Sequence, residues 1–262
     1  MHNFDFVKPS TIADAVSAMG GDGAQALSGG QTLIPTMKQR LAAPTVLVSL
    51  TGIAEMRGVC TGDGGLHIGA ATPHAVVANE AAAHYPALAA LAGGIGDPAV
   101  RTKGTIGGSL ANDDPAACYP AAVLASGATV VTNKRKIAAD DYFHGLFTTA
   151  LEEGEIITSV VFPLPEKAAY VKFIQPASRF ALTGVFVAKY AGGVRVAVTG
   201  ASSAGVFRWA EGETALSANF SASALSGLTV DASDMIGDLH GTPVYRANLV
   251  KVLTGRAVTA AG

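Results

Sequence analysis

Two glycine pairs with hydroxyl-bearing neighbours constrain this sequence more than any other feature. The first pair lies in Ser28-Gly29-Gly30-Gln31-Thr32, and the second lies in Thr105-Ile106-Gly107-Gly108-Ser109. A diphosphate group requires convergent backbone N–H groups and no Cβ atom in the way, and a Gly-Gly pair supplies both. Each pair alone is also typical of a plain structural turn, but the two together favour a nucleotide site.

Neither loop has the pattern G-x-G-x-x-G or G-x-x-x-x-G-K-[ST], so the sequence does not support a Rossmann or P-loop site. Two loops that close on one diphosphate could hold a large dinucleotide such as FAD without a strong positive charge. The composition agrees, because 18 Lys and Arg against 20 Asp and Glu give a net charge of −2. That balance predicts no nucleic-acid partner and no anionic membrane surface as a partner.

Helix and strand patterns alternate around the first loop. Thr11-x-x-Asp14 resembles a capping box and predicts a helix after it. We expect buried strands over 24–27 and 46–48, with a helix over 33–41 between them. This order predicts an α/β unit in which a crossover joins two strands.

A second unit follows and extends to residue 162. The expected strands lie near 66–68, over 128–131 and over 156–162, with a polar turn at 133–136. The expected helices begin at Thr72-Pro73 and cover 86–91 and 116–125. The segment 93–108 is dense in glycine and turn residues, which predicts an irregular loop.

Pro163-Leu164-Pro165 is the best candidate for a domain boundary. Beyond it, we expect strands over 170–174, 183–190 and 194–199, with a hairpin turn at Gly192-Gly193, and helices over 210–216 and 244–253. The C-terminal part is therefore expected to be a sheet covered by helices.

The composition predicts a folded, cytoplasmic protein. Hydrophobic residues make up 49% and charged residues 15%, which favours a well-buried core. With only Cys60 and Cys118, the chain fits a reducing compartment and cannot by itself hold an iron–sulfur cluster, which usually needs four thiolates. We expect no signal peptide, no membrane insertion and no metal site, since the six histidines lack ligand spacing.

Two longer segments make the sequence similar to a known family. Residues 28–41 (SGGQTLIPTMKQRL) and 105–121 (TIGGSLANDDPAACYPA) resemble the two FAD-binding signatures of the medium, flavin-carrying subunit of the molybdenum hydroxylases. This family includes carbon monoxide dehydrogenase and xanthine dehydrogenase. Further matching segments at 144–163, 172–188 and 196–208 extend the resemblance over almost the whole chain.

The resemblance implies an α+β fold with a vanillyl-alcohol-oxidase-type (PCMH-type) FAD-binding domain at 1–165. Two α/β subdomains, at about 1–55 and 56–165, would form this domain. A smaller α+β domain of the carbon monoxide dehydrogenase flavoprotein type would follow at 166–262.

The resemblance also implies which residues bind FAD. The two glycine loops would wrap the diphosphate, Asn112 and Asp114 would lie beside the flavin or ribose end, Ile157 would pack on the cofactor, and Lys172 would lie at the adenine end. The predicted cofactor-binding residues are Ser28, Gly29, Gly30, Gln31, Thr32, Thr105, Ile106, Gly107, Gly108, Ser109, Asn112, Asp114, Cys118, Ile157 and Lys172. No catalytic acid or base is expected on this chain.

Cys118 departs from the family pattern. Many relatives carry an aspartate at this place, which is suited to binding a ribose hydroxyl. A thiol is a weak donor and acceptor, so that contact is weakened here or passes to Asp113 or Asp114. Alternatively, Cys118 is simply a small buried hydrophobic residue on a helix.

The implied function is an FAD-carrying electron-transfer subunit. It would take electrons from two-iron, two-sulfur clusters in a small partner subunit and pass them to an external acceptor, while a molybdopterin cofactor in a large partner subunit oxidises the substrate. Relatives of this kind assemble as dimers of heterotrimers. Two alternatives remain open: a self-sufficient flavin oxidase or reductase of the same superfamily, and a non-redox scaffold subunit.

Overall fold

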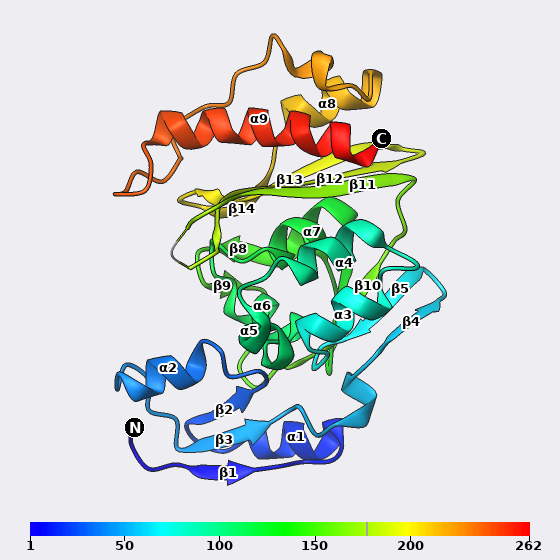
Figure 1. The fold of residues 1–262 in the computed structure, drawn as a ribbon. Helices are drawn as coiled ribbons and strands as arrows, with labels where there is room; N and C mark the ends of the chain where they lie inside the picture. The colour runs from blue at the N-terminus through cyan, green and yellow to red at the C-terminus, as the bar shows by residue number, and fades with distance from the viewer. Residues whose placement is uncertain (177) are drawn as a thin grey trace.

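The computed structural model describes residues 1–176 and 178–262, and their elements form three stacked units (Figure 1). The N-terminal unit lies at one end, a mixed middle unit follows, and a sheet covered by the long C-terminal helix lies at the other end. This is the α+β architecture that the sequence predicts.

The N-terminal unit is a small parallel α/β layer. Its elements are β1 (Asp5–Val7), α1 (Ile12–Met19), β2 (Ala24–Leu27), α2 (Leu33–Lys38) and β3 (Val46–Ser49). The strand order is β1-β3-β2, and both pairs are parallel, which confirms the predicted crossover. Thr11 caps α1 as predicted, because its Oγ1 accepts from the amide of Asp14 at 3.1 Å. The sequence did not predict β1, and α2 ends earlier than expected, before the left-handed Arg40 (φ 61°).

The middle unit is an antiparallel sheet with helices packed on it. Its strands are β4 (Val59–Gly62), β5 (Gly65–Gly69), β6 (Thr129–Thr132), β7 (Lys136–Ala138) and β10 (Ile157–Phe162), and β10 lies in the centre of the order β4-β5-β10-β6-β7. Its helices are α3 (His74–Glu80), α4 (Pro86–Gly93), α5 (Pro98–Lys103), α6 (Ile106–Asn112) and α7 (Tyr119–Ser126). A small hairpin of β8 (Phe143–Gly145) and β9 (Thr148–Thr149) and two short 3-10 turns, Ala54–Met56 and Ala139–Asp141, complete it.

The predicted loop over 93–108 is wrong, because two helices begin inside it. Asp97 accepts from the amide of Val100 at 2.9 Å and starts α5, with Pro98 in the first turn. Thr105 accepts from the amide of Gly108 at 3.1 Å and starts α6. The side-chain caps therefore outweigh the helix-breaking effect of the glycines.

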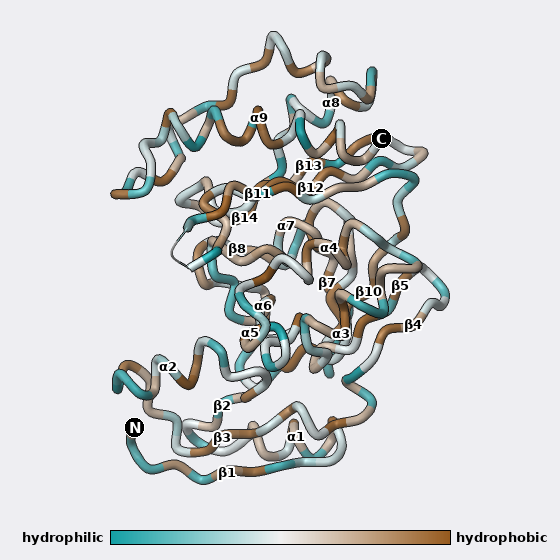
Figure 2. The backbone as a smooth tube through the Cα atoms, viewed as in Figure 1, coloured by the Kyte–Doolittle hydropathy of each residue, from teal (hydrophilic) through white to brown (hydrophobic). Residues whose placement is uncertain are grey.

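The C-terminal unit is an antiparallel sheet with its own helices on one face, while α4 and α7 of the middle unit lie against the other face. Its strands in spatial order are β11 (Lys167–Ile174), β12 (Ala181–Tyr190), β13 (Gly193–Ser202) and β14 (Gly205–Arg208), and its helices are α8 (Ala210–Ala218) and α9 (Pro243–Ala261), with a 3-10 turn at Ala222–Leu225. The predicted hairpin at Gly192-Gly193 is confirmed. The hydrophobic segments of this sheet are brown in Figure 2.

Residues of β12 alternate between two cores. Phe186 and Ala188 pack toward α4 and α7 in a core that continues into the first two units, whereas Val185 and Val187 pack toward α9. This alternation follows from the two-residue period of a strand. The C-terminal sheet thus shares a core with the middle unit, which holds it firmly against the site described next.

Candidate cofactor-binding site

The first glycine loop connects β2 to α2 and presents unpaired backbone donors. Among the described residues, the amide groups of 29–33 have no hydrogen-bond acceptor in the protein. Gly30 has a positive φ of 68°, a conformation that glycine adopts readily and other residues rarely adopt. Successive free N–H groups at the start of a helix are suited to binding an anion.

The two glycine loops touch each other. A Cβ atom on Gly29 would overlap the backbone of Lys103 and Gly104, which immediately precede the second loop. The hydroxyl groups of Ser28 and Thr105 form a hydrogen bond of 2.7 Å between the loops. The predicted juxtaposition of the loops is therefore present in the structure.

The second loop differs from expectation, because its amides already have acceptors in the protein. The first N–H groups of a helix are normally free. In α6, however, the amide of Ile106 donates to Thr72 O at 3.3 Å, and that of Gly107 to Ala70 O at 2.9 Å. The amide of Gly108 donates to the Thr105 hydroxyl at 3.1 Å. This loop therefore supplies close packing and shape where we expected free donors.

One cavity of about 530 Å³ brings the predicted residues together. It is lined by Ser28, Gly29, Gly30, Gln31, Thr32, Thr105, Gly107, Gly108, Ser109, Asn112, Asp114, Cys118, Ile157 and Lys172. Ile106 is the exception, since its side chain is fully buried in the core and does not line the cavity. The roles of these residues toward a cofactor stay predictions.

Carboxylates lie where α6 ends. Asp113 adopts a left-handed conformation (φ 43°) after Asn112, and the carboxylate of Asp114 accepts from the amide of Ala116 at 2.8 Å. Burial, and then repulsion from Asp114, raise the pKa of Asp113 to about 7. Asn112 and Asp114 line the cavity, whereas Asp113 lies behind it.

The wall beside Ile157 is held by a buried carboxylate that the sequence did not single out. Glu155 accepts from Thr132 Oγ1 at 2.6 Å and from Arg135 Nη2 at 3.0 Å. These hydrogen bonds, with Arg135 the largest cause, lower the pKa of Glu155 to about 2. Arg135 belongs to the segment 133–136, which we expected to be a polar turn. Only the acidic residues shortly before Ile157 could have indicated an ion-pair partner for it.

The side chain of Lys172 extends from β11 to Gly94 at the end of α4. Its Nζ donates to Gly94 O at 2.8 Å and to Arg179 O at 2.9 Å, and it lies 3.6 Å from Cys118 Sγ. Cys118 is buried at the start of α7 and still lines the cavity. The structure therefore joins two residues that the sequence named for separate reasons.

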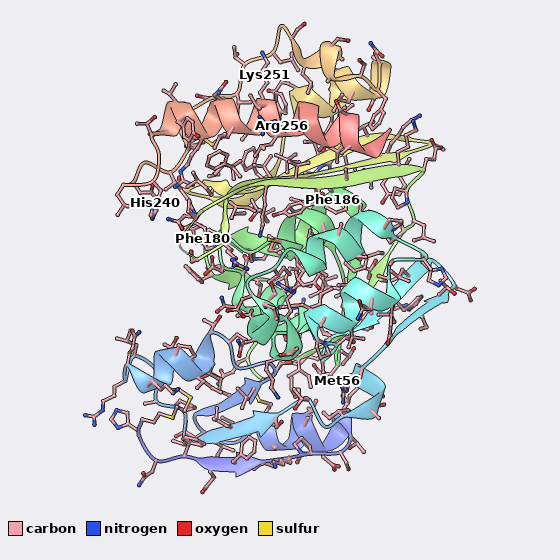
Figure 3. All side chains as sticks on the ribbon, in the orientation of Figure 1. Met56, Phe180, Phe186, His240, Lys251 and Arg256 are labelled. Atoms are coloured by element: carbon pink, nitrogen blue, oxygen red, sulfur yellow. The ribbon has the colours of Figure 1, made fainter. Side chains whose placement is uncertain are left out.

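Further lining residues were missed by the sequence. Buried His74 lies beside Gly104; burial and then Arg101 lower its pKa to about 4, so it is neutral at physiological pH. Phe180 lies at the edge of the cavity, with its ring centre 6.0 Å from that of His240, and Met56 lies where the first two units meet (Figure 3). These positions depend on long-range packing, which a single sequence does not reveal.

Comparison with known proteins identifies the family of this chain. A sequence profile described as "FAD binding domain in molybdopterin dehydrogenase" matches residues 2–165. The chain is 32% identical to the nicotine 6-hydroxylase medium subunit of Paenarthrobacter nicotinovorans, over 98% of this chain and 96% of the relative. It is 31% identical to the glyceraldehyde dehydrogenase medium chain of Sulfolobus acidocaldarius, over 97% and 96%.

Solved structures agree with the sequence matches. The reconstituted CO dehydrogenase from Oligotropha carboxidovorans contains a chain that matches with a TM-score of 0.90 at 31% identity, covering 99% of this chain and 98% of that one. The fold and the cavity thus define a PCMH-type flavoprotein. This chain belongs to the family of FAD-binding medium subunits of the molybdenum hydroxylases, and it is an oxidoreductase subunit. Among the described residues, no helix is both long and apolar enough to cross a membrane.

Proposed function

We propose that this chain carries FAD and transfers electrons within a multi-subunit molybdenum hydroxylase. It takes them from two-iron, two-sulfur clusters of a small partner subunit and passes them to an external acceptor. The observation that carries the proposal is the row of unpaired amides at 29–33 on a cavity shared with the second glycine loop. When bound, FAD supplies the redox chemistry, and the chain binds and orients it.

The residues present fit FAD at the diphosphate. The free amides of 29–33 would donate hydrogen bonds to the phosphate oxygens, and Gly29 lets the first loop approach the backbone of Lys103 and Gly104 closely enough to form a narrow cradle. Ser109 and Asn112, whose side chains have no hydrogen-bond partner among the described residues, donate to the polar part of the cofactor. Ile156 and Ile157 form an apolar, closed wall that is suited to the adenine ring.

We infer the partner subunits of this chain from the names of its relatives. Relatives are named as medium subunits or medium chains, and this supports a large molybdopterin-binding partner and a small iron–sulfur partner. We further propose that the three subunits assemble as a dimer of heterotrimers. We place the complex in the cytoplasm, in keeping with the free thiols of Cys60 and Cys118. We divide the chain into a PCMH-type domain at 1–165, with subdomains of about 1–55 and 56–165, and a C-terminal domain at 166–262.

Reconstitution of the full chain with FAD tests the proposal. We expect one FAD per chain, a yellow flavin spectrum, and quenching of flavin fluorescence as the cavity fills. Co-expression with a large molybdopterin-binding subunit and a small iron–sulfur subunit should give a complex in which the bound flavin is reduced by the substrate of the large subunit. A chain that assembles with those partners but binds no FAD would be a scaffold, and substrate turnover by the isolated chain would indicate a self-sufficient enzyme.

A further inference from the structure

Lys172 carries a positive charge at the cavity wall without a carboxylate to neutralise it. Its ammonium group contacts the carbonyl oxygens of Gly94 and Arg179 and the sulfur of Cys118. Among the described residues, no carboxylate lies within ion-pair distance of it, whereas the cavity carboxylate Glu155 is paired with Arg135. The contacts of Lys172 are therefore all with uncharged or weak acceptors.

Two further buried donors lie near Cys118. The hydroxyl group of Tyr170, two residues before Lys172 on β11, is buried with the weak acceptor Cys118 as its neighbour, and the buried hydroxyl group of Tyr119, the residue after Cys118, has no hydrogen-bond partner among the described residues. Burial, followed by the neighbouring Cys118, raises the pKa of Tyr170. A carboxylate at position 118 would be a stronger acceptor for Tyr170 than the thiol is, and it would also neutralise the charge of Lys172, whose three N–H groups already have acceptors.

The shape of the cavity indicates which end of FAD lies near Lys172. The wall formed by Ile156 and Ile157 is almost fully buried, whereas Arg179, on the Lys172 side, is exposed. Electrons must reach the flavin ring from a partner protein, so the ring requires the accessible end. The adenine ring undergoes no redox change and can occupy the closed apolar end.

We propose that Lys172, which Cys118 leaves without a carboxylate partner, faces the flavin ring and stabilises its reduced state. The inference rests on the proposed function, and it places Lys172 at the opposite end from the adenine end that the sequence suggested. Reduction adds negative charge to the ring, and a cation in a partly enclosed cavity attracts that charge more strongly than it would in water. The pair Cys118 and Lys172 thereby holds the reduction potential of the flavin above the value that a carboxylate at position 118 would give.

The test compares the midpoint potential of FAD bound to the full chain in wild type and four variants, measured by reductive titration against a dye of known potential. Cys118→Asp should weaken binding of reduced FAD relative to oxidised FAD about tenfold, which lowers the two-electron potential by about 30 mV. Lys172→Gln should lower it in the same direction. Cys118→Ser adds no charge and should leave the potential unchanged, and Lys172→Arg should keep most of it.

Equal potentials in wild type, Cys118→Asp and Lys172→Gln, all with FAD bound, would overturn the inference and return Lys172 to the adenine end. Lys172→Gln alone decides the question if Cys118→Asp does not fold. Failure of the proposed function has a different signature, since the wild-type chain would then show no flavin spectrum and no potential could be measured.

Discussion

In the first glycine loop the amides of 29–33 have no acceptor among the described residues, whereas in the second loop those of 106–109 all have one. The two loops share a Gly-Gly pair and hydroxyl-bearing neighbours, so the sequence gives no reason to separate them. The two loops differ because different parts of the folded chain surround them. The first loop follows the end of β2, where no carbonyl group among the described residues accepts from its amides. The second loop lies against the carbonyl groups of Ala70 and Thr72, which accept from its amides. Similar sequence patterns can thus leave free donors that suit a ligand in one place and serve for packing in another.

The largest expected effect comes from Gly29, at the contact between the loops. Gly29→Ala places a Cβ against the backbone of Lys103 and Gly104, which cannot rotate away as a side chain could. We expect the first loop to shift and FAD affinity to fall about 100-fold, or about 2.7 kcal/mol. Titration of flavin fluorescence measures this change. Gly192→Ala is the matched control, because apart from its chain neighbours no atom of the described residues lies within 4 Å of its added Cβ. Equal FAD affinities for the two variants would show that the close approach of Gly29 to Gly104 does not shape the binding site.

Gly107 tests the other side of the comparison. In Gly107→Ala the new Cβ would lie 2.6 Å from Ala70 Cβ, inside the core, so we expect a loss of about 2 kcal/mol in the free energy of unfolding. The amide of Gly107 is already bonded to Ala70 O, so FAD affinity of the folded variant should change only a few-fold. Urea unfolding and fluorescence titration separate the two quantities. A large loss of affinity at unchanged stability would show that the second loop also binds through its amides.

Asp113, just after α6, makes the stability of this second region depend on pH. Its pKa is about 7 in the folded chain and near 3.8 when unfolded, so the folded state holds a proton that the unfolded state releases. Stability is therefore lost as the pH rises from about 4 to about 7. Asp113→Asn keeps the left-handed conformation and should stabilise the protein by about 1.5 kcal/mol at pH 8 but not at pH 4. Exposed Asp63→Asn is the control, and the same gain at both pH values would contradict this origin.

The local signals of the sequence predict the fold better than they predict the site. Thr11 caps α1 through a hydrogen bond to a residue only three positions away. The strand–helix–strand order of 24–49 likewise follows from patterns of residues that are close in the sequence. The free or bonded state of the loop amides depends on acceptors such as Ala70 and Thr72, which only the folded chain brings near. For the same reason the sequence could not show that Glu155 pairs with Arg135.

The smallest expected effect concerns the hydrogen bond between the loops. Thr105 Oγ1 both accepts from the amide of Gly108 and pairs with Ser28 Oγ, so Thr105→Val removes a helix cap and the link between the loops. We expect it to cost about 1 kcal/mol in the free energy of unfolding, whereas Ser28→Ala, which keeps the cap, should cost about 0.5 kcal/mol.

The double variant separates these contributions. If the hydroxyl pair acts as one link, Thr105→Val combined with Ser28→Ala should cost less than the sum of the single changes, because the second substitution finds the bond already broken. Thr105→Ser retains the hydroxyl and should behave like wild type. Strict additivity, measured by urea unfolding, would mean that the two loops are held together by the close approach of Gly29 to Gly104 alone, and that the hydroxyl groups matter only within their own loops.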